Sequence, residues 1–423
     1  MKIGFSKENI TPPVGTELAG YAGYRPCSGI HDPLWCKAMV LEQADGRYAL
    51  LVLDLMCVDE SLYLKIAEGV AHLNISKERL LVSAIHSHAA PRGCIPGQGR
   101  LHRLNNAGFW HDEEFTLYIH DVVRKAVKAC ETAVESLEPF RLRAAQGKLP
   151  EIGSERHTGQ KPEGCLTVLH FQTESGRDLL VYQLPCHPTV LSAANMEVSA
   201  DFVGQIERHL DADMGIFVNG AAGDISTRFT RREQSFAECE RLGAIAAEAI
   251  GVLIQDAKFD APAPLLGKQL RIPLKTRQVE PEEAARKKLE EATANWKKAE
   301  EEGADPADLR ILKSYVEGAG VSLEFSRLMG DIHELELPVC VFCFAGLEFV
   351  SIPGELFSTL LPSKKTVAIC YANGYDRYIA SADAYDKGYY EAMAAILARG
   401  QGEILKNLLE IETKTIKNRR NTP

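Results

Sequence analysis

The strongest constraint on the fold is an apolar run that stops abruptly at two histidines. Residues 80–85 are mostly apolar and rich in branched side chains, and His86, Ser87 and His88 follow directly. Such a run predicts a buried strand whose C-terminal end lies at a site. Because side chains alternate along an extended chain, we expect His86 and His88 to point the same way, toward one metal ion or substrate group. Two surface histidines after a strand are the alternative.

Four other apolar runs end in the same manner. They are followed by His187, by residues 219–226, by Glu355, and by Tyr375 and Tyr378. In open α/β sheets ligands bind where the C-terminal ends of strands gather, so these distant segments are expected to meet. Two imidazoles and a carboxylate are a common zinc set. A metal there would lower the pKa of bound water toward ~7 and polarise a carbonyl, which suits hydrolysis of an amide or ester.

The remaining pattern predicts an α/β fold with a mixed β-sheet core and flanking helices. Residues 48–53 form a continuous apolar run, typical of a buried strand, and residues 61–73, 115–137 and 236–254 have helical spacing. Asp54, at the end of the first run, either supports a metal-bound histidine or caps the next helix. His31 is a further candidate, with capping by Asp32 in a turn as the alternative.

A polar helical hairpin is expected at residues 278–330, inserted into a single domain that spans residues 1–423. Residues 280–303 are nearly all Ala, Glu, Lys and Arg, and Asp305-Pro306 starts a second helix. The hairpin is either a solvated surface element or a lid over the site. The Gly- and Pro-rich residues 93–108 predict a loop over the site, and the basic tail from residue 414 is expected to fray.

Composition and charge limit the classes of binding partner that we expect. The chain has 423 residues, 45% hydrophobic and 25% charged, with a formal net charge of −10. This charge disfavours a broad attraction to nucleic acid or anionic lipid, although Arg228, Arg231 and Arg232 form a local basic patch. No segment approaches the ~18 apolar residues of a membrane span, and the N-terminus lacks a signal-like apolar region, so we expect a cytoplasmic protein.

The number and positions of the cysteines also favour a cytoplasmic location. Eleven are scattered through strand-like runs, which predicts reduced and mostly buried thiols. Cys340 and Cys343 have the spacing of a redox or zinc pair, but they lie inside an apolar strand with no second pair nearby. Packing in the core is therefore the favoured interpretation.

Short motifs resemble the neutral/alkaline ceramidase family in their order and spacing. These motifs are residues 10–15 with Gly20-Tyr21, residues 29–31, 83–88, 186–189, 223–226 and 353–355, and Tyr378 ahead of Tyr385 and residues 390–392. The resemblance implies a zinc amidohydrolase. It implies His86, His187, Glu355 and Tyr378 as zinc ligands, His88 and Arg156 as catalytic neighbours, and Ser226 at the position described as the nucleophile.

The nucleophile and the substrate stay open at this stage. A serine needs an adjacent base or metal, and a water activated by zinc is the alternative that chemistry favours. Thr227 replaces the family's usual proline, and Ala-Ala follows His88 in place of Ser-Gly. Neither the signal segment nor the immunoglobulin-like domain of secreted ceramidases is expected. The expected substrate is a small-molecule amide, either ceramide-like or smaller and more polar. A metal-dependent esterase, a phosphoester hydrolase and a non-catalytic zinc-binding homologue are the alternatives, and the oligomeric state is not predicted.

Overall fold

The core of the molecule is a mixed eight-stranded sheet, as the apolar runs predict. The computed structural model describes residues 1–99, 113–162, 164–329 and 332–420. In sheet order the strands are β11 (Met214–Asn219), β9 (Asp178–Leu184), β8 (Leu166–Thr173), β6 (Glu138–Gly147), β1 (Lys2–Asn9), β3 (Trp35–Gln43), β4 (Gly46–Leu53) and β5 (Leu80–Ala84). The β4–β5 and β9–β11 pairs are parallel and the others are antiparallel. The predicted α/β fold with a mixed sheet is confirmed.

A second sheet packs against the first. Its strands are β13 (Leu266–Lys275), β14 (Glu334–Phe344), β15 (Leu347–Ser351) and β17 (Val367–Ile369). Phe344 of β14 stacks on Phe171 of β8 with ring centroids 6.2 Å apart, and both side chains are buried. One continuous apolar core therefore lies between the two sheets.

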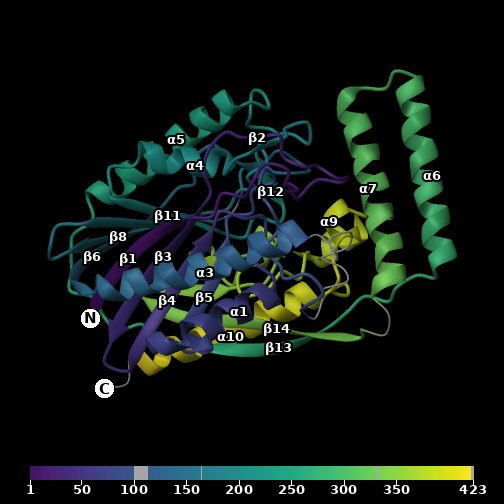
Figure 1. The fold of residues 1–423 in the computed structure, drawn as a ribbon. Helices are drawn as coiled ribbons and strands as arrows, with labels where there is room; N and C mark the ends of the chain where they lie inside the picture. The colour runs from purple at the N-terminus through teal and green to yellow at the C-terminus, as the bar shows by residue number, and fades with distance from the viewer. Residues whose placement is uncertain (100–112, 163, 330–331, 421–423) are drawn as a thin grey trace.

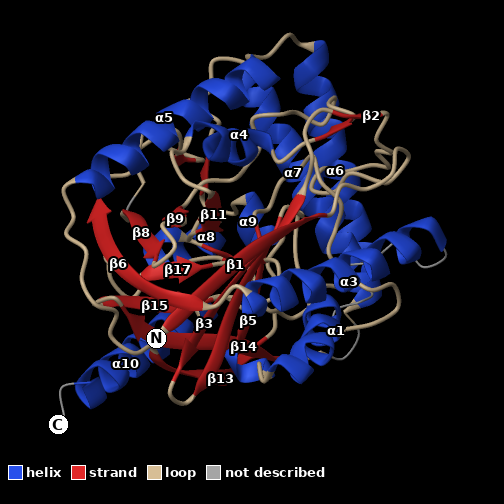
Figure 2. Ribbon diagram, turned by 60° about the vertical axis from the view of Figure 1, so that its left-hand side comes forward, coloured by secondary structure: helices blue, strands red, loops and turns tan. Residues whose placement is uncertain are grey.

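Helices flank the two sheets on their outer sides (Figure 2). The helices are α1 (Glu60–Val70), α3 (Glu113–Glu135), α4 (Asp201–His209), α5 (Phe236–Gln255) and α10 (Gln401–Arg420). In α3 the buried residues Ile119, Val122 and Ala126 recur at helical spacing, and the helix lies on β1 and β3. Helix α5 contacts β6 and β8, whereas α10 contacts β13 and β14. Among the described residues, no helix combines the length and apolar character that crossing a membrane requires.

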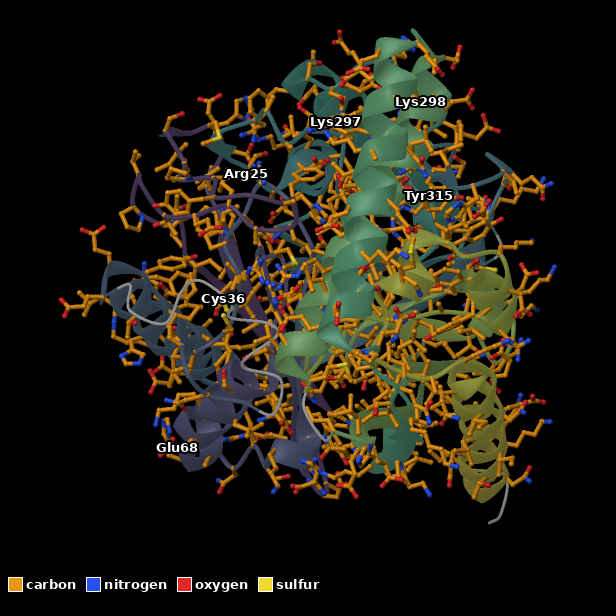
Figure 3. All side chains as sticks on the ribbon, turned by 90° about the vertical axis from the view of Figure 1, so that its right-hand side faces the viewer. Arg25, Cys36, Glu68, Lys297, Lys298 and Tyr315 are labelled. Atoms are coloured by element: carbon orange, nitrogen blue, oxygen red, sulfur yellow. The ribbon has the colours of Figure 1, made fainter. Side chains whose placement is uncertain are left out.

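The predicted polar hairpin is also confirmed. Strands β13 and β14 pair from Leu266↔Cys343 to Lys275↔Glu334, and the chain between them forms α6 (Glu282–Glu301) and α7 (Pro306–Leu328). These two helices pack together and project from the body, with α7 beside α9 (Tyr390–Met393) (Figure 1). Figure 3 shows the hairpin from its outer side, with Tyr315 on α7. Only Ala285 of α6 is buried, which explains its polar sequence.

Three local expectations have separate outcomes. Over residues 414–420 the expected fraying is wrong: α10 continues to Arg420, and Leu409, Thr413 and Ile416 are buried against the second sheet. Residues 100–108 of the loop expected over the site lie outside the described residues. Cys340 and Cys343 are buried in β14, in agreement with packing in the core.

Candidate metal centre

Three histidines from two strand ends converge. His86 and His88 follow β5, and His187 follows β9. One ring nitrogen from each lies within 4.8 Å of the others. The Nε2 atoms of His86 and His88 are 3.4 Å apart, and the rings of His86 and His187 meet edge to face at 4.8 Å. The His88 side chain is partly exposed, whereas His86 and His187 are buried, so the cluster opens on the side of His88.

A turn, and not strand alternation, brings His86 and His88 together. Strand β5 ends at Ala84, and His86 has a φ of +72°, in the left-handed region that non-glycine residues rarely adopt. Such a conformation costs about 1–3 kcal/mol and is concentrated at functional sites. It is held by the bond from His86 N–H to the Leu55 carbonyl (3.0 Å) and by stacking of the ring on Tyr371 (4.1 Å).

Glu355 brings a carboxylate to the same point. It begins β16 (Glu355–Leu356), which pairs in parallel with β18 (Tyr378–Ile379), so that Glu355 lies opposite Tyr378. Glu355 Oε2 is 2.8 Å from His187 Nε2 and 3.5 Å from His86 Nε2. The Tyr375 hydroxyl donates to the other oxygen, Oε1, at 2.6 Å. The carboxylate is thereby fixed with one oxygen toward the two imidazoles.

The protonation pattern of these imidazoles fits a cation. His86 Nδ1 donates to the Met56 carbonyl and His187 Nδ1 to the Ala222 carbonyl, each at 2.7 Å. A carbonyl oxygen only accepts, so Nδ1 carries the proton and a neutral ring presents a bare Nε2. Burial, with Arg156 nearby, lowers the pKa of His187 to about 4, which keeps the ring neutral at pH 7. Two lone pairs and a carboxylate oxygen then face one another, and a divalent cation between them satisfies all three.

His88 is positioned by packing. Its ring meets the Tyr21 ring edge to face at 4.8 Å, and a Cβ added to Gly20 would lie 2.3 Å from His88 Cγ. Burial and the neighbouring His86 lower the pKa of His88 well below its usual value. Its Nδ1 is buried and has no hydrogen-bond partner among the described residues. The geometry places His88 inside the cluster, where it can serve as a ligand or face the substrate.

Arg156 and Tyr378 form an adjoining layer. Arg156 Nη1 donates to the Tyr378 hydroxyl and to Glu391 Oε1, each at 3.1 Å, and His157 pairs with the other Glu391 oxygen at 2.9 Å. The Tyr378 ring stacks beside His187 with centroids 6.4 Å apart. Burial and the charge of Glu355 raise the pKa of Tyr378 well above its usual value, so the phenol is neutral until a cation offsets both effects.

Ser226 lies beside this cluster in a short ladder. It ends β12 (Ile225–Ser226), which pairs with β7 (Ser154–Glu155), and it also bridges to His187. Its side chain is buried, and Oγ accepts a bond of 3.4 Å from the Arg228 N–H. In the described part of the chain, no imidazole or carboxylate hydrogen-bonds to Ser226 Oγ. A base that would activate this serine is therefore not in contact with it.

Two other candidates lie outside the cluster. His31 Nδ1 pairs with Asp32 at 2.7 Å and its ring stacks on Phe236, the turn role that was the alternative. Asp54 accepts the Trp35 N–H and, among the described residues, contacts no histidine, and the cap of α1 is Asp59. Both roles considered for Asp54 are therefore wrong.

Sequence reasoning assigned no role to Tyr375 or Glu391, although both lie in the segments that were singled out. The only signals in the sequence are their positions. Tyr375 lies three residues before the candidate ligand Tyr378, and Glu391 directly follows Tyr390.

Comparisons with known proteins identify a family and a shared fold. Residues 1–231 match the family model for neutral/alkaline non-lysosomal ceramidase, N-terminal, a range that holds all three clustered histidines. The structure of neutral ceramidase from Pseudomonas aeruginosa superposes with a TM-score of 0.74 at 18% identity, over 99% of this chain and 74% of that one. A ceramidase complexed with C2 gives 0.71 at 18% identity, over 99% and 75%.

At this identity the likeness to the solved structures concerns the fold, and no curated protein sequence matched the chain. The family model, however, covers 231 of the 423 residues. The chain therefore belongs to the neutral/alkaline non-lysosomal ceramidase family.

Proposed function

We propose that this protein is a zinc-dependent hydrolase that cleaves the C–N bond of an N-acyl amide, either ceramide-like or smaller and more polar. The observation that carries the proposal is the convergence of His86, His187 and Glu355 with both Nδ1 atoms committed to carbonyl oxygens. A set of imidazole nitrogens and one carboxylate oxygen is typical of zinc. His88 and Tyr378 adjoin the set, as a fourth ligand or as contacts to substrate.

The chain's own residues supply binding and orientation. A zinc ion in this set would act as a Lewis acid toward the scissile carbonyl. Arg156 is charged, partly buried and hydrogen-bonded to Tyr378, so it supports the phenol and adds positive potential where negative charge develops. We propose water as the nucleophile and a substrate contact for Ser226, because Ser226 Oγ lacks a base among the described residues.

The loop after β11 supports amide over phosphoester hydrolysis. Its N–H groups at Gly220, Gly223 and Ile225 donate to the carbonyls of Leu184, Leu356 and Ala222. A phosphate cradle needs such N–H groups to be available. The three bonds occupy three of the N–H donors on which the phosphoester alternative depends.

Metal analysis combined with a substrate panel tests the proposal. We expect about one zinc per chain, hydrolysis of an amide in a panel of amides, esters and phosphates, and loss of both zinc and turnover in His187→Ala. Chelation should abolish turnover and added Zn²⁺ should restore it. His209→Ala is the matched control, because His209 is half-exposed on α4 and pairs with Glu240.

Three outcomes would contradict the proposal. Absence of stoichiometric zinc, or unchanged zinc in His187→Ala, would remove the metal centre. Cleavage of phosphates alone would favour the phosphoester alternative. Zinc binding without activity toward any panel member would identify a non-catalytic homologue.

A further inference from the structure

Two arginines, Arg228 and Arg231, follow Ser226 in the chain. Arg228 Nη1 donates to the Arg156 carbonyl at 3.2 Å. Arg231 Nη1 donates to the Thr189 carbonyl at 2.9 Å and to Thr227 Oγ1 at 3.2 Å. Thr189 is two residues from His187, and its N–H donates to the His187 carbonyl. Arg228 and Arg231, the arginine pair, are thus each tied to segments that shape the candidate metal centre.

The charge of the arginine pair is not neutralised by a carboxylate. A carbonyl or hydroxyl accepts a hydrogen bond but leaves the cation uncompensated, and each guanidinium has five donors. In the part of the chain that the structure describes, neither arginine forms an ion pair. The charge of Glu391 attracts Arg228, but Glu391 forms ion pairs with Arg156 and His157. The charge of Asp201 attracts Arg231, but Asp201 accepts hydrogen bonds from the N–H groups of Leu191 and Phe202.

The hairpin adds to this positive field. Arg310 is exposed on α7; burial is the main cause, and the charge of Arg310 a smaller one, of the lowered pKa of both members of the arginine pair. Helix α7 also brings Glu317 toward Arg228. The charges of Glu317, Glu391 and Asp201 attract the arginine pair, but among the described residues none of these carboxylates forms an ion pair with it.

We propose that the substrate of this site carries an anionic group, a carboxylate or a phosphate, that the arginine pair binds. This inference rests on the proposed amide hydrolysis. Guanidinium groups match carboxylate and phosphate oxygens in paired hydrogen bonds, and fixed cations near a partly buried site act with little screening. The Arg228 N–H donates to Ser226 Oγ, so the arginine pair adjoins the segment that we propose contacts substrate. The chain's net charge of −10 makes a local cationic pair necessary to attract an anion.

Three matched amides test the proposal on the full-length protein supplied with Zn²⁺. They are N-octanoylglycine, the phosphate ester of N-octanoylethanolamine, and neutral N-octanoylethanolamine. We expect kcat/KM for at least one anionic amide to exceed that for the neutral amide by about tenfold or more, since a hydrogen bond to a charged group contributes at this level. The better anionic substrate decides between carboxylate and phosphate.

Variants separate recognition from structure. Arg228→Gln and Arg231→Gln should lower kcat/KM for the anionic amide about 10- to 100-fold more than for the neutral amide, mainly through KM. Arg231→Lys should keep part of the preference. Arg232→Gln is the matched control: it removes the same charge from an exposed neighbour and should change neither substrate. Equal kcat/KM for neutral and anionic amides, or a preference that survives both Gln variants, would overturn the inference.

If no amide is hydrolysed, calorimetry with the two anionic amides still decides the matter. Binding that both Gln variants abolish and Arg232→Gln preserves would uphold the anion site while the proposed function fails. Absence of binding would overturn both.

Discussion

At the scale of single residues, Tyr375 holds the carboxylate that completes the metal centre. Its hydroxyl donates to Glu355 Oε1 at 2.6 Å, a distance typical of a charge-assisted bond, and it leaves Oε2 directed at His187 and His86. Bonds of this kind orient a ligand before the metal arrives. Their loss usually weakens metal binding without unfolding the protein.

We therefore expect Tyr375→Phe to weaken zinc binding about 10- to 100-fold while the fold persists. Competition with a chromophoric chelator measures the affinity. Tyr385→Phe is the matched control, because the Tyr385 hydroxyl donates at the same distance, 2.6 Å, to the Leu397 carbonyl. Equal zinc affinity in wild type and Tyr375→Phe would argue against Glu355 as a ligand.

Ser226 gives a second prediction at this scale. Since Oγ only accepts a bond from the Arg228 N–H, we expect Ser226→Ala to keep measurable turnover and full zinc content. Steady-state kinetics and the intact mass of quenched reactions check both points. Ser154→Ala is the control, since Ser154 is opposite Ser226 in the ladder and equally buried. Complete loss of turnover with zinc still bound, together with an acyl-enzyme in wild type, would make Ser226 the nucleophile.

At the scale of elements, the hairpin divides into an anchored half and a free half. In α7, Ala319, Leu323 and Phe325 are buried, and Phe325 lies under Arg277 and Arg377. Toward the tip, Ile311 is 50% exposed. The Glu282–Arg327 ion pair fixes how the two helices align. The tip therefore contributes little to the core, although it carries Arg310.

Replacing residues 294–314 with a short turn should leave the melting temperature and the zinc content nearly unchanged. It should raise KM for an anionic amide, because Arg310 is removed. Arg310→Gln in the full-length chain should reproduce that rise. A similar rise for neutral amides would show instead that the hairpin acts as a lid, and loss of zinc would show that its tip supports the fold.

Elements whose signal is local could be predicted from the sequence. The apolar run at residues 48–53 became part of β4, and the helical spacing of residues 115–137 became α3. In each case the pattern lies within one element, where side-chain periodicity reports directly on burial.

The pairings that build the metal centre could not be predicted in the same way. Strands β16 and β18 have two residues each, too few for any periodicity, yet they place Glu355 opposite Tyr378. The left-handed turn at His86 depends on contacts with Leu55 and Tyr371, which are distant in the sequence. The alternation argument for His86 and His88 reached the right cluster through the wrong geometry. Pairing between segments that are distant in the sequence can therefore be determined only from the structure.

At the scale of the whole molecule, buried carboxyl groups make stability depend on pH. Burial raises the pKa of Asp54, Asp201 and Asp224 to about 6 and that of Asp59 to about 7. In the unfolded chain these groups titrate near pH 3.8. Between these values the native state binds more protons than the unfolded state, so the free energy of unfolding falls as the pH rises.

We expect the metal-free protein to lose a few kcal/mol of stability between pH 5 and pH 8, since each unit of pKa difference corresponds to about 1.4 kcal/mol. Urea unfolding in the presence of a chelator measures this, because zinc would add an opposite dependence through its histidines. Asp59→Asn keeps the oxygen that accepts from Ser61 and Leu62 but cannot ionise, so its stability should change less with pH and exceed that of wild type at pH 8. Asp383→Asn, at an exposed position in α8 (Ala382–Asp386), should leave the pH dependence unaltered. If wild type and Asp59→Asn lose stability equally between the two pH values, Asp59 is ionised in the native state at both, and the hydrogen bonds from Ser61 and Leu62 must stabilise the buried charge.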